Sequence, residues 1–161
     1  AILSKTPAIR QVGGYSIKLK GSRKGATDEP YVLVSVNEKI NLGNIADESV
    51  GVLGILDRKG MKKLVGRYVP QPVHLKRLLK TEDLLGLLTL KMGRAVLVPE
   101  YDVSYFEKRS RMNFIITPVP GMRIEIVSLA LKHGGSASAT VSAVRGMDNK
   151  IKELLRIDSW K

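Results

Sequence analysis

The sequence predicts a small α+β domain, and three observations lead to this class. Apolar and polar residues alternate near the N-terminus and again after residue 94, which is typical of half-buried strands. Over residues 58–80 and 138–157, apolar residues recur at helical spacing. A chain of 161 residues with 43% hydrophobic residues can bury one core of ordinary size. We therefore expect a single basic domain over residues 1–161, with antiparallel strands, a central group of short helices and a C-terminal helix.

The N-terminal region is expected to form an arm followed by a β-hairpin. Residues 1–11 have little pattern, and Pro7 discourages a continuous helix across them, so we predict an N-terminal arm. Residues 12–20 alternate in polarity, and residues 31–36 are rich in β-branched and aromatic types. Both patterns predict strands, which the loop over residues 21–30 would join into a hairpin.

The central region is predicted to be helical. The apolar positions of residues 50–56 favour a first helix, although two glycines weaken the pattern. Residues 58–80 contain eight Lys or Arg residues and no acidic residue. On a helical wheel these cations separate from the apolar residues, and Pro72 divides the run into two basic amphipathic helices. A further helix that is apolar nearly all round starts at Thr81 and is expected to be buried.

The second half of the chain is predicted to return to β structure before a final helix. The sequence EKRSR resembles an exposed hairpin turn, and GGSASA, residues 134–139, predicts a flexible connection without bulky side chains. The last helix is expected over residues 138–157. The predicted strands are residues 94–99, 101–106, 112–117 and 122–131.

Charge is the strongest functional signal in the sequence. The chain has 27 Lys and Arg residues against 15 Asp and Glu, a net charge of +12 at neutral pH. Clustered cations bind a phosphate backbone by releasing condensed counterions, so the basic run predicts a surface for a polyanion. The two loops with cationic tips would extend it. The candidate nucleic-acid-binding residues are Arg58, Lys59, Lys62, Lys63, Arg67, Lys76, Arg77 and Lys80 in the run, with Arg23, Lys24, Lys108, Arg109 and Arg111 in the loops.

The sequence gives little support to an enzymatic or a metal-binding function. The absence of cysteine excludes disulfides and thiolate metal sites, and the two histidines are far apart. The segment ILDRK resembles a short pattern of metal-dependent nucleases, but Asp57 fits equally well beside a helix. The basic amphipathic helix lacks the aromatic residues usual in membrane-surface helices. We therefore expect no catalytic residues, no metal, no cofactor, no membrane partner and no small-molecule substrate.

The favoured function is an architectural protein that coats or condenses DNA or RNA largely independently of sequence. Its partner would be the nucleic-acid backbone, in a homo-oligomeric assembly of the nucleocapsid type. The alternatives are a self-assembling coat or filament subunit that binds no nucleic acid, and an accessory factor for nucleic-acid processing. No apolar run is long enough to span a bilayer and no signal-peptide pattern is present. We expect a location in the cytoplasm or inside a virion or nucleoprotein particle, and the scarcity of Cys and Gln favours a thermophilic source.

Overall fold

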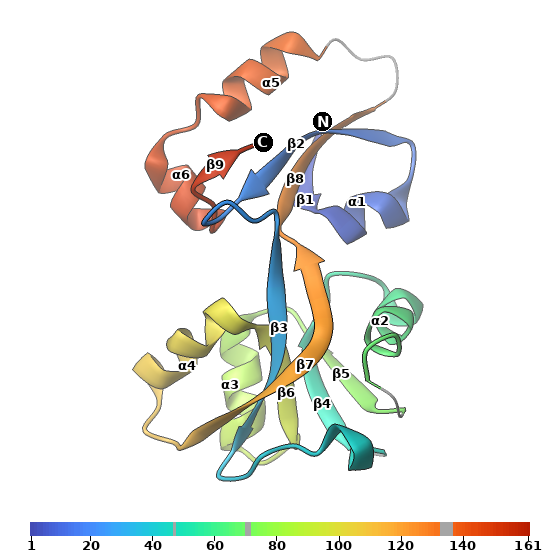
Figure 1. Cartoon of the computed structure of the whole chain (residues 1–161), viewed down its shortest axis with the longest axis vertical. Coiled ribbons are helices and arrows are strands. Elements are labelled where there is room, and N and C mark those ends of the chain that lie inside the picture. The colour runs from blue at the N-terminus through green and yellow to red at the C-terminus, as the bar shows by residue number, and fades with distance from the viewer. Residues whose placement is uncertain (47, 70–71, 133–136) are drawn as a thin grey trace. The chain divides into compact units, whose positions relative to one another are not determined.

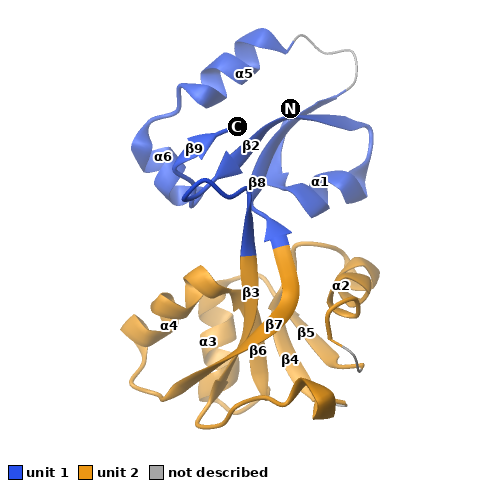
Figure 2. Cartoon of the chain, in the orientation of Figure 1, with its two compact units in different colours: residues 1–29, 124–161 blue, residues 30–123 orange. Residues whose placement is uncertain are grey.

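The computed structural model describes residues 1–46, 48–69, 72–132 and 137–161. Helices and strands are interspersed along the described chain, which confirms the predicted α+β class. The chain divides into two compact units, shown in two colours in Figure 2. Unit 1 contains residues 1–29 and 124–161, and unit 2 contains residues 30–123. The single domain over residues 1–161 stays a prediction, and each unit is described by itself.

Unit 1 is built on a four-stranded antiparallel sheet in the order β1-β8-β2-β9. The predicted arm is wrong, because residues 1–11 form a strand and most of a helix. Pro7 stands at the start of that helix, where its missing N–H leaves no hydrogen bond unmade, and Ile9 is a buried residue of the same helix. The elements of this unit are β1 (Ile2–Lys5), α1 (Thr6–Val12), β2 (Tyr15–Ser22), β8 (Val127–Lys132), α5 (Ser138–Arg145), α6 (Asn149–Leu154) and β9 (Ser159–Trp160).

The C-terminal helix is shorter than expected, because it divides in two. Gly146 ends α5, and the side chain of Asp148 caps α6 by accepting a hydrogen bond of 2.9 Å from the N–H of Ile151. Of the predicted connection over 134–139, residues 134–136 lie outside the described residues, and α5 has already begun at Ser138.

Unit 2 contains a five-stranded sheet in the order β5-β4-β6-β3-β7, flanked by helices. Strand β4 is parallel to both β5 and β6, whereas β3 is antiparallel to β6. Figure 1 shows α2 and α4 at opposite sides of this unit. The elements are β3 (Asp28–Val36), η1 (Leu42–Asn44), β4 (Ser49–Leu53), α2 (Arg58–Val65), β5 (His74–Leu78), α3 (Thr81–Thr89), β6 (Ala95–Pro99), η2 (Glu100–Asp102), α4 (Val103–Arg109) and β7 (Phe114–Glu125).

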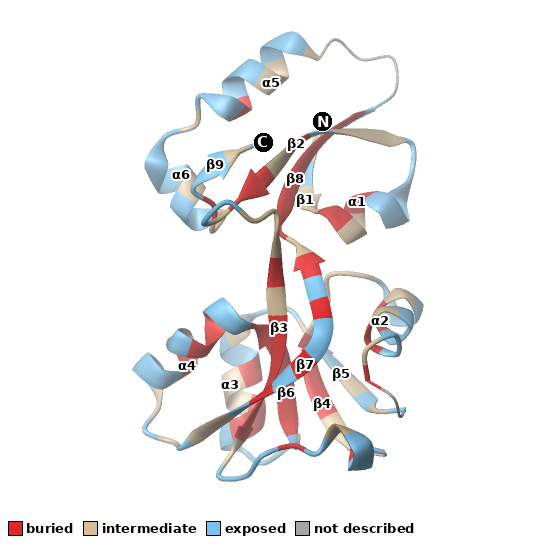
Figure 3. Cartoon of the chain, viewed as in Figure 1, coloured by how far each residue is buried: buried red, intermediate tan, exposed pale blue. Residues whose placement is uncertain are grey.

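The core of unit 2 lies between the sheet and helices α3 and α4. Alternate residues of β3 and β6 face these helices, and the ring of Phe106 is fully buried among them. Figure 3 shows the buried residues concentrated on β3, β4 and β6. Helix α2 buries Met61 and Val65 on its own inner face, as its helical spacing predicts. The residues of the α3–α4 core are Val32, Val34, Leu84, Leu87, Leu88, Val96, Val98, Val103 and Phe106.

Several local predictions are confirmed, and the errors share a physical cause. The strands over 15–22 and 95–99 and the helices starting at Arg58 and Thr81 are present. The expected helix over 50–56 is instead strand β4, which is buried on both faces and so lacks alternation.

The second basic helix is also absent, because His74–Leu78 forms strand β5. Five residues are too few to separate the strand period from the helix period. Conversely, the predicted strand over 101–106 is η2 and the start of α4, and the predicted break between residues 117 and 122 lies within the continuous strand β7.

The expected N-terminal hairpin does not form. Strand β2 pairs with β8 and β9 in unit 1, whereas β3 lies between β6 and β7 in unit 2. The loop between β2 and β3 contains only an isolated bridge between Arg23 and Ala26. No helix among the residues described is both long and apolar enough to cross a lipid bilayer.

Candidate functional site

The parallel strands β4, β5 and β6 end at the same edge of the sheet in unit 2. In open α/β sheets, the carboxyl ends of parallel strands are where ligands bind, because the loops and helix starts that follow them gather there. We define the carboxyl edge as the residues that follow these three strands. They are 54–58 after β4, 79–80 after β5, and 100–102 after β6.

Arg77 is the cation that the fold fixes most closely at this edge. A methyl group built on Gly54 would lie 3.1 Å from Nη2 and 3.2 Å from Nε of Arg77, so the guanidinium lies directly over the backbone at Gly54. The two strands are held together there by a hydrogen bond of 3.0 Å from the Gly54 N–H to the carbonyl of Leu78. Arg77 is exposed, and no carboxylate of the described residues pairs with it. Its charge is therefore available to a ligand.

The loops beside Arg77 supply a capped helix start and an exposed aromatic ring. Asp57 caps α2, since its Oδ1 accepts a hydrogen bond of 2.6 Å from the N–H of Gly60. The next two residues, Arg58 and Lys59, are exposed cations. After β6, Asp102 is buried whereas Tyr101 is 57% exposed. The edge therefore offers charged side chains of both signs together with an aromatic surface, and Arg77 stands beside it without an ion-pair partner among the described residues.

A titrating cluster stands just beyond this edge, where α3 begins. The pKa of Glu82 is lowered, first by its own backbone N–H and then by the Tyr105 hydroxyl, with smaller contributions from the positive charges of Arg109 and Lys80. Desolvation is the main cause that raises the pKa of Tyr105, followed by Glu82. The guanidinium of Arg109 lies 4.5 Å from the centre of the Tyr105 ring. Glu82 lies at the start of α3, and Tyr105 and Arg109 lie on α4.

The structure distributes the predicted nucleic-acid-binding residues over separate places. Arg23 is engaged within unit 1, because it pairs with Glu29, and the backbone N–H of its neighbour Lys24 donates to Asp158. Helices α2 and α4 lie at opposite sides of unit 2, so their cations do not form one surface (Figure 1). The residues are Arg58, Lys59, Lys62, Lys63 and Arg67 on or after α2, Lys76, Arg77 and Lys80 on or after β5, Lys108, Arg109 and Arg111 on or after α4, and Arg23 and Lys24 in unit 1.

Sequence reasoning did not find the carboxyl edge, although a signal was present. Three short strands, each followed by a turn and a helix, are the pattern of parallel β-α units. The pattern was obscured because β4 and β5 were read as helices.

Comparison with known proteins relates the chain to solved structures only. No protein-family model matches it, and no curated protein matches it. It is similar to the periplasmic VFT2 domain of BvgS from Bordetella pertussis, with 13% identity and a TM-score of 0.59 over 96% of this chain and 64% of that one. It is also similar to the amino acid transporter substrate-binding protein AbpA from Streptococcus pneumoniae bound to L-arginine, with 14% identity and a TM-score of 0.54 over 74% and 49% of the two chains.

A third similar structure is the GluR0 ligand-binding core in complex with L-glutamate, with 12% identity and a TM-score of 0.54 over 78% of this chain and 55% of that one. The chain spans less than two thirds of the length of each of these solved chains. At such identities the likeness shows the fold alone.

This likeness contradicts the predicted function. The prediction of a nucleic-acid-coating, nucleocapsid-type protein is wrong, and so is the alternative of a coat subunit, because similar structures were solved with the small molecules L-arginine and L-glutamate bound. The expectation of a nucleic-acid partner without a small-molecule ligand is wrong for the same reason. Net charge gives the sign of the partner's charge, whereas the arrangement of the strands determines what can reach the cations.

Proposed function

We propose that this chain is a non-enzymatic small-molecule-binding domain whose ligand carries a carboxylate and lies at the carboxyl edge of unit 2. The observation that carries the proposal is the guanidinium of Arg77, which is held over Gly54 at the ends of parallel strands and has no carboxylate partner among the described residues. Support also comes from the likeness of the fold to domains solved with L-arginine and L-glutamate, which both carry a carboxylate.

The guanidinium of Arg77 suits a small ligand that carries a carboxylate. A guanidinium donates two parallel hydrogen bonds to the two oxygens of a carboxylate, which fixes the orientation of a small ligand as well as its charge. Lys80 and Arg58 are further cations at the same edge, where Asp57 and Glu100 are exposed anions. The exposed ring of Tyr101 provides a flat surface for the uncharged part of the ligand.

The proposal is tested with a panel of the twenty common amino acids together with succinate and citrate. A ligand that binds only the folded chain raises its melting temperature, so a thermal-shift screen should identify at least one acid, and titration calorimetry should then give its Kd. Removing a charge-assisted contact costs about 1.5–3 kcal/mol of binding free energy, so Arg77→Gln should lower the affinity for that acid by about 10- to 150-fold. Arg77→Lys keeps the charge but loses the paired donors, so its affinity for the acid should lie between those of the unmodified chain and of Arg77→Gln.

Arg111→Gln is the matched control, because it also removes one exposed arginine charge but lies after α4, away from the carboxyl edge. It should bind that acid with the same affinity as the unmodified chain. Equal losses in the Arg77 and Arg111 variants would mean that net charge and not the site governs binding, which would contradict the proposal. So would a panel in which no acid binds.

A further inference from the structure

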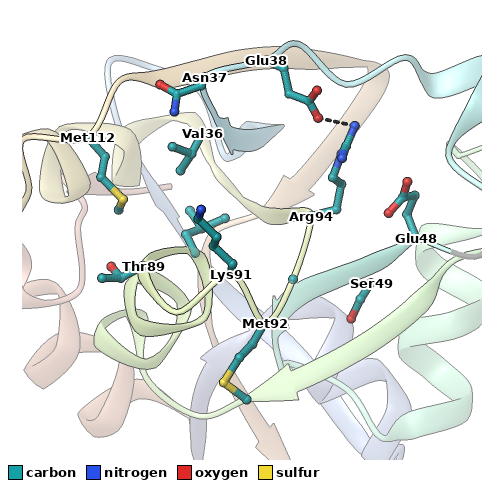
Figure 4. A pocket seen from close by; sticks show the side chains of 12 residues that line it. Val36, Asn37, Glu38, Glu48, Ser49, Thr89, Lys91, Met92, Arg94 and Met112 are labelled. Atoms are coloured by element: carbon teal, nitrogen blue, oxygen red, sulfur yellow. Dashed lines mark ion pairs between the residues drawn. The ribbon is translucent and has the colours of Figure 1, made fainter.

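A hollow lies at the end of the unit 2 sheet opposite the carboxyl edge, where β4 and β6 begin and β3 ends. Its volume is about 540 Å³, which is within the range of small-molecule sites. Figure 4 shows charged, polar and apolar side chains from several elements around it. The lining residues are Val36, Asn37, Glu38, Glu48, Ser49, Leu88, Thr89, Lys91, Met92, Gly93, Arg94 and Met112.

The charged groups of this hollow are only partly matched to one another. Glu38 and Arg94 form an ion pair, drawn as the dashed line in Figure 4, so each neutralises the other. Glu48 and Lys91, one anion and one cation, have no ion-pair partner among the described residues. The hydroxyl of Ser49 is buried and has no hydrogen-bond partner there either. A ligand with one positive and one negative group would satisfy both charges.

The backbone at Lys91 gives an independent reason to assign a role to its side chain. Helix α3 ends in a Schellman motif, in which the N–H of Lys91 donates to the carbonyl of Leu88 and the N–H of Met92 donates to that of Leu87. Lys91 has a φ of 54°, in the left-handed region where glycine is the usual residue. A lysine there is less favourable for the fold than glycine, so its ammonium group is the feature that glycine could not supply.

The remaining wall of the hollow is apolar. Val36 and Leu88 line it from β3 and α3, and the flexible side chains of Met92 and Met112 lie on it. Met92 is 56% exposed, so its side chain can be reached by a ligand. Methionine adapts to apolar groups of different shape. The hollow therefore combines two free charges of opposite sign with an adaptable apolar wall.

From these observations we infer that the hollow is a second binding site, separate from the carboxyl edge, for a zwitterionic ligand with an apolar side chain and a size up to that of a dipeptide. Lys91 binds the ligand's carboxylate, Glu48 binds its ammonium group, and the two methionines contact its hydrocarbon part. Ser49 supplies a further hydrogen-bonding group. This inference does not depend on the function proposed for the carboxyl edge.

The probe is the dipeptide leucyl-leucine, and the readout is the NMR spectrum of the chain labelled in its methionine methyl groups. The chain has five methionines, of which only Met92 and Met112 line the hollow. Titration to about 10 mM, which detects a Kd near 1 mM, should shift these two signals in a saturable way and leave that of Met61 on α2 unchanged. The N-acetylated and the C-amidated dipeptides, which each lack one charge, should bind at least 5-fold more weakly.

Two variants separate binding from folding. Lys91→Gly should lower the affinity at least 5-fold while its melting temperature is unchanged or higher, because glycine suits the left-handed position. Lys91→Arg should restore binding. The inference is overturned if leucyl-leucine leaves both methionine signals unshifted, if the blocked dipeptides bind equally well, or if Lys91→Gly binds as the unmodified chain does. Arg77→Gln should leave these shifts intact, so failure at one site is distinguishable from failure at the other.

Discussion

Gly54→Ala tests whether the position of the Arg77 guanidinium controls ligand affinity at the carboxyl edge. The new methyl group would lie 3.1 Å from Nη2 and 3.2 Å from Nε of Arg77. Favourable contact between such atoms begins at about 3.5 Å, so the guanidinium must move by roughly 0.3–0.5 Å. Since it is the exposed end of a flexible side chain, the fold accommodates the change but the ligand meets a displaced fork of donors.

The two effects of this substitution have opposite signs. Gly54 is not among the described glycines with positive φ, so alanine adds no backbone strain. It restricts the unfolded chain and should raise the free energy of unfolding by about 0.4–1 kcal/mol. A misaligned charge-assisted contact should cost about 1 kcal/mol of binding free energy, which lowers the affinity for the ligand about 5-fold.

The assay is titration calorimetry with the tightest acid of the panel, together with urea denaturation of the same samples. In an Arg77→Gln background, Gly54→Ala should have no further effect on the affinity, because the group that it displaces is already gone. Additive losses in the double variant, or normal affinity in the single one, would refute the assignment of Arg77 as the group that holds the ligand.

Three further predictions concern the framework of unit 2. Gly93→Ala should lower the free energy of unfolding by about 1–3 kcal/mol, because its methyl group would lie 2.0 Å from Cδ2 of Leu87. The control is Gly86→Ala on α3, which has open space around it and should be neutral or stabilising in the same denaturation assay. Phe106→Ala should cost about 3–5 kcal/mol, since its ring is fully buried in the core. The lowered pKa of Glu82 contributes stability that is present above its ordinary value of 4.5 and is lost as pH falls through the folded value. Glu82→Gln should therefore reduce the loss of unfolding free energy as the pH falls through the acid range. An unchanged dependence on pH would show that Glu82 does not contribute to it.

Local periodicity predicted much of the fold. Helix α2 separates Met61 and Val65 from its cations, and α3 has acidic residues in its first turn before an apolar body. Both helices form where these patterns are strongest. Strands β4 and β5 were missed for opposite reasons, since β4 is buried on both faces and β5 is a short strand at the edge of the sheet. Neither burial state is visible before the strands are paired.

The candidate site depends on that pairing. Arg77 and Gly54 are separated by 22 residues of sequence that include a whole helix, and only the parallel register of β4 with β5 brings them together. Charge counting ranked Arg77 no higher than the other cations of its run. The property that distinguishes it, contact with a glycine at the ends of parallel strands, belongs to the three-dimensional structure.

The most direct test of the proposed function compares the tightest acid of the panel with its own carboxamide, in the unmodified chain and in Arg77→Gln. The amide has nearly the same size but lacks the negative charge that Arg77 would bind. We predict that the unmodified chain prefers the acid by about 10-fold or more, and that this preference falls to near unity in Arg77→Gln. A preference of the same size in both proteins would show that Arg77 does not contact the carboxylate and would contradict the proposed site.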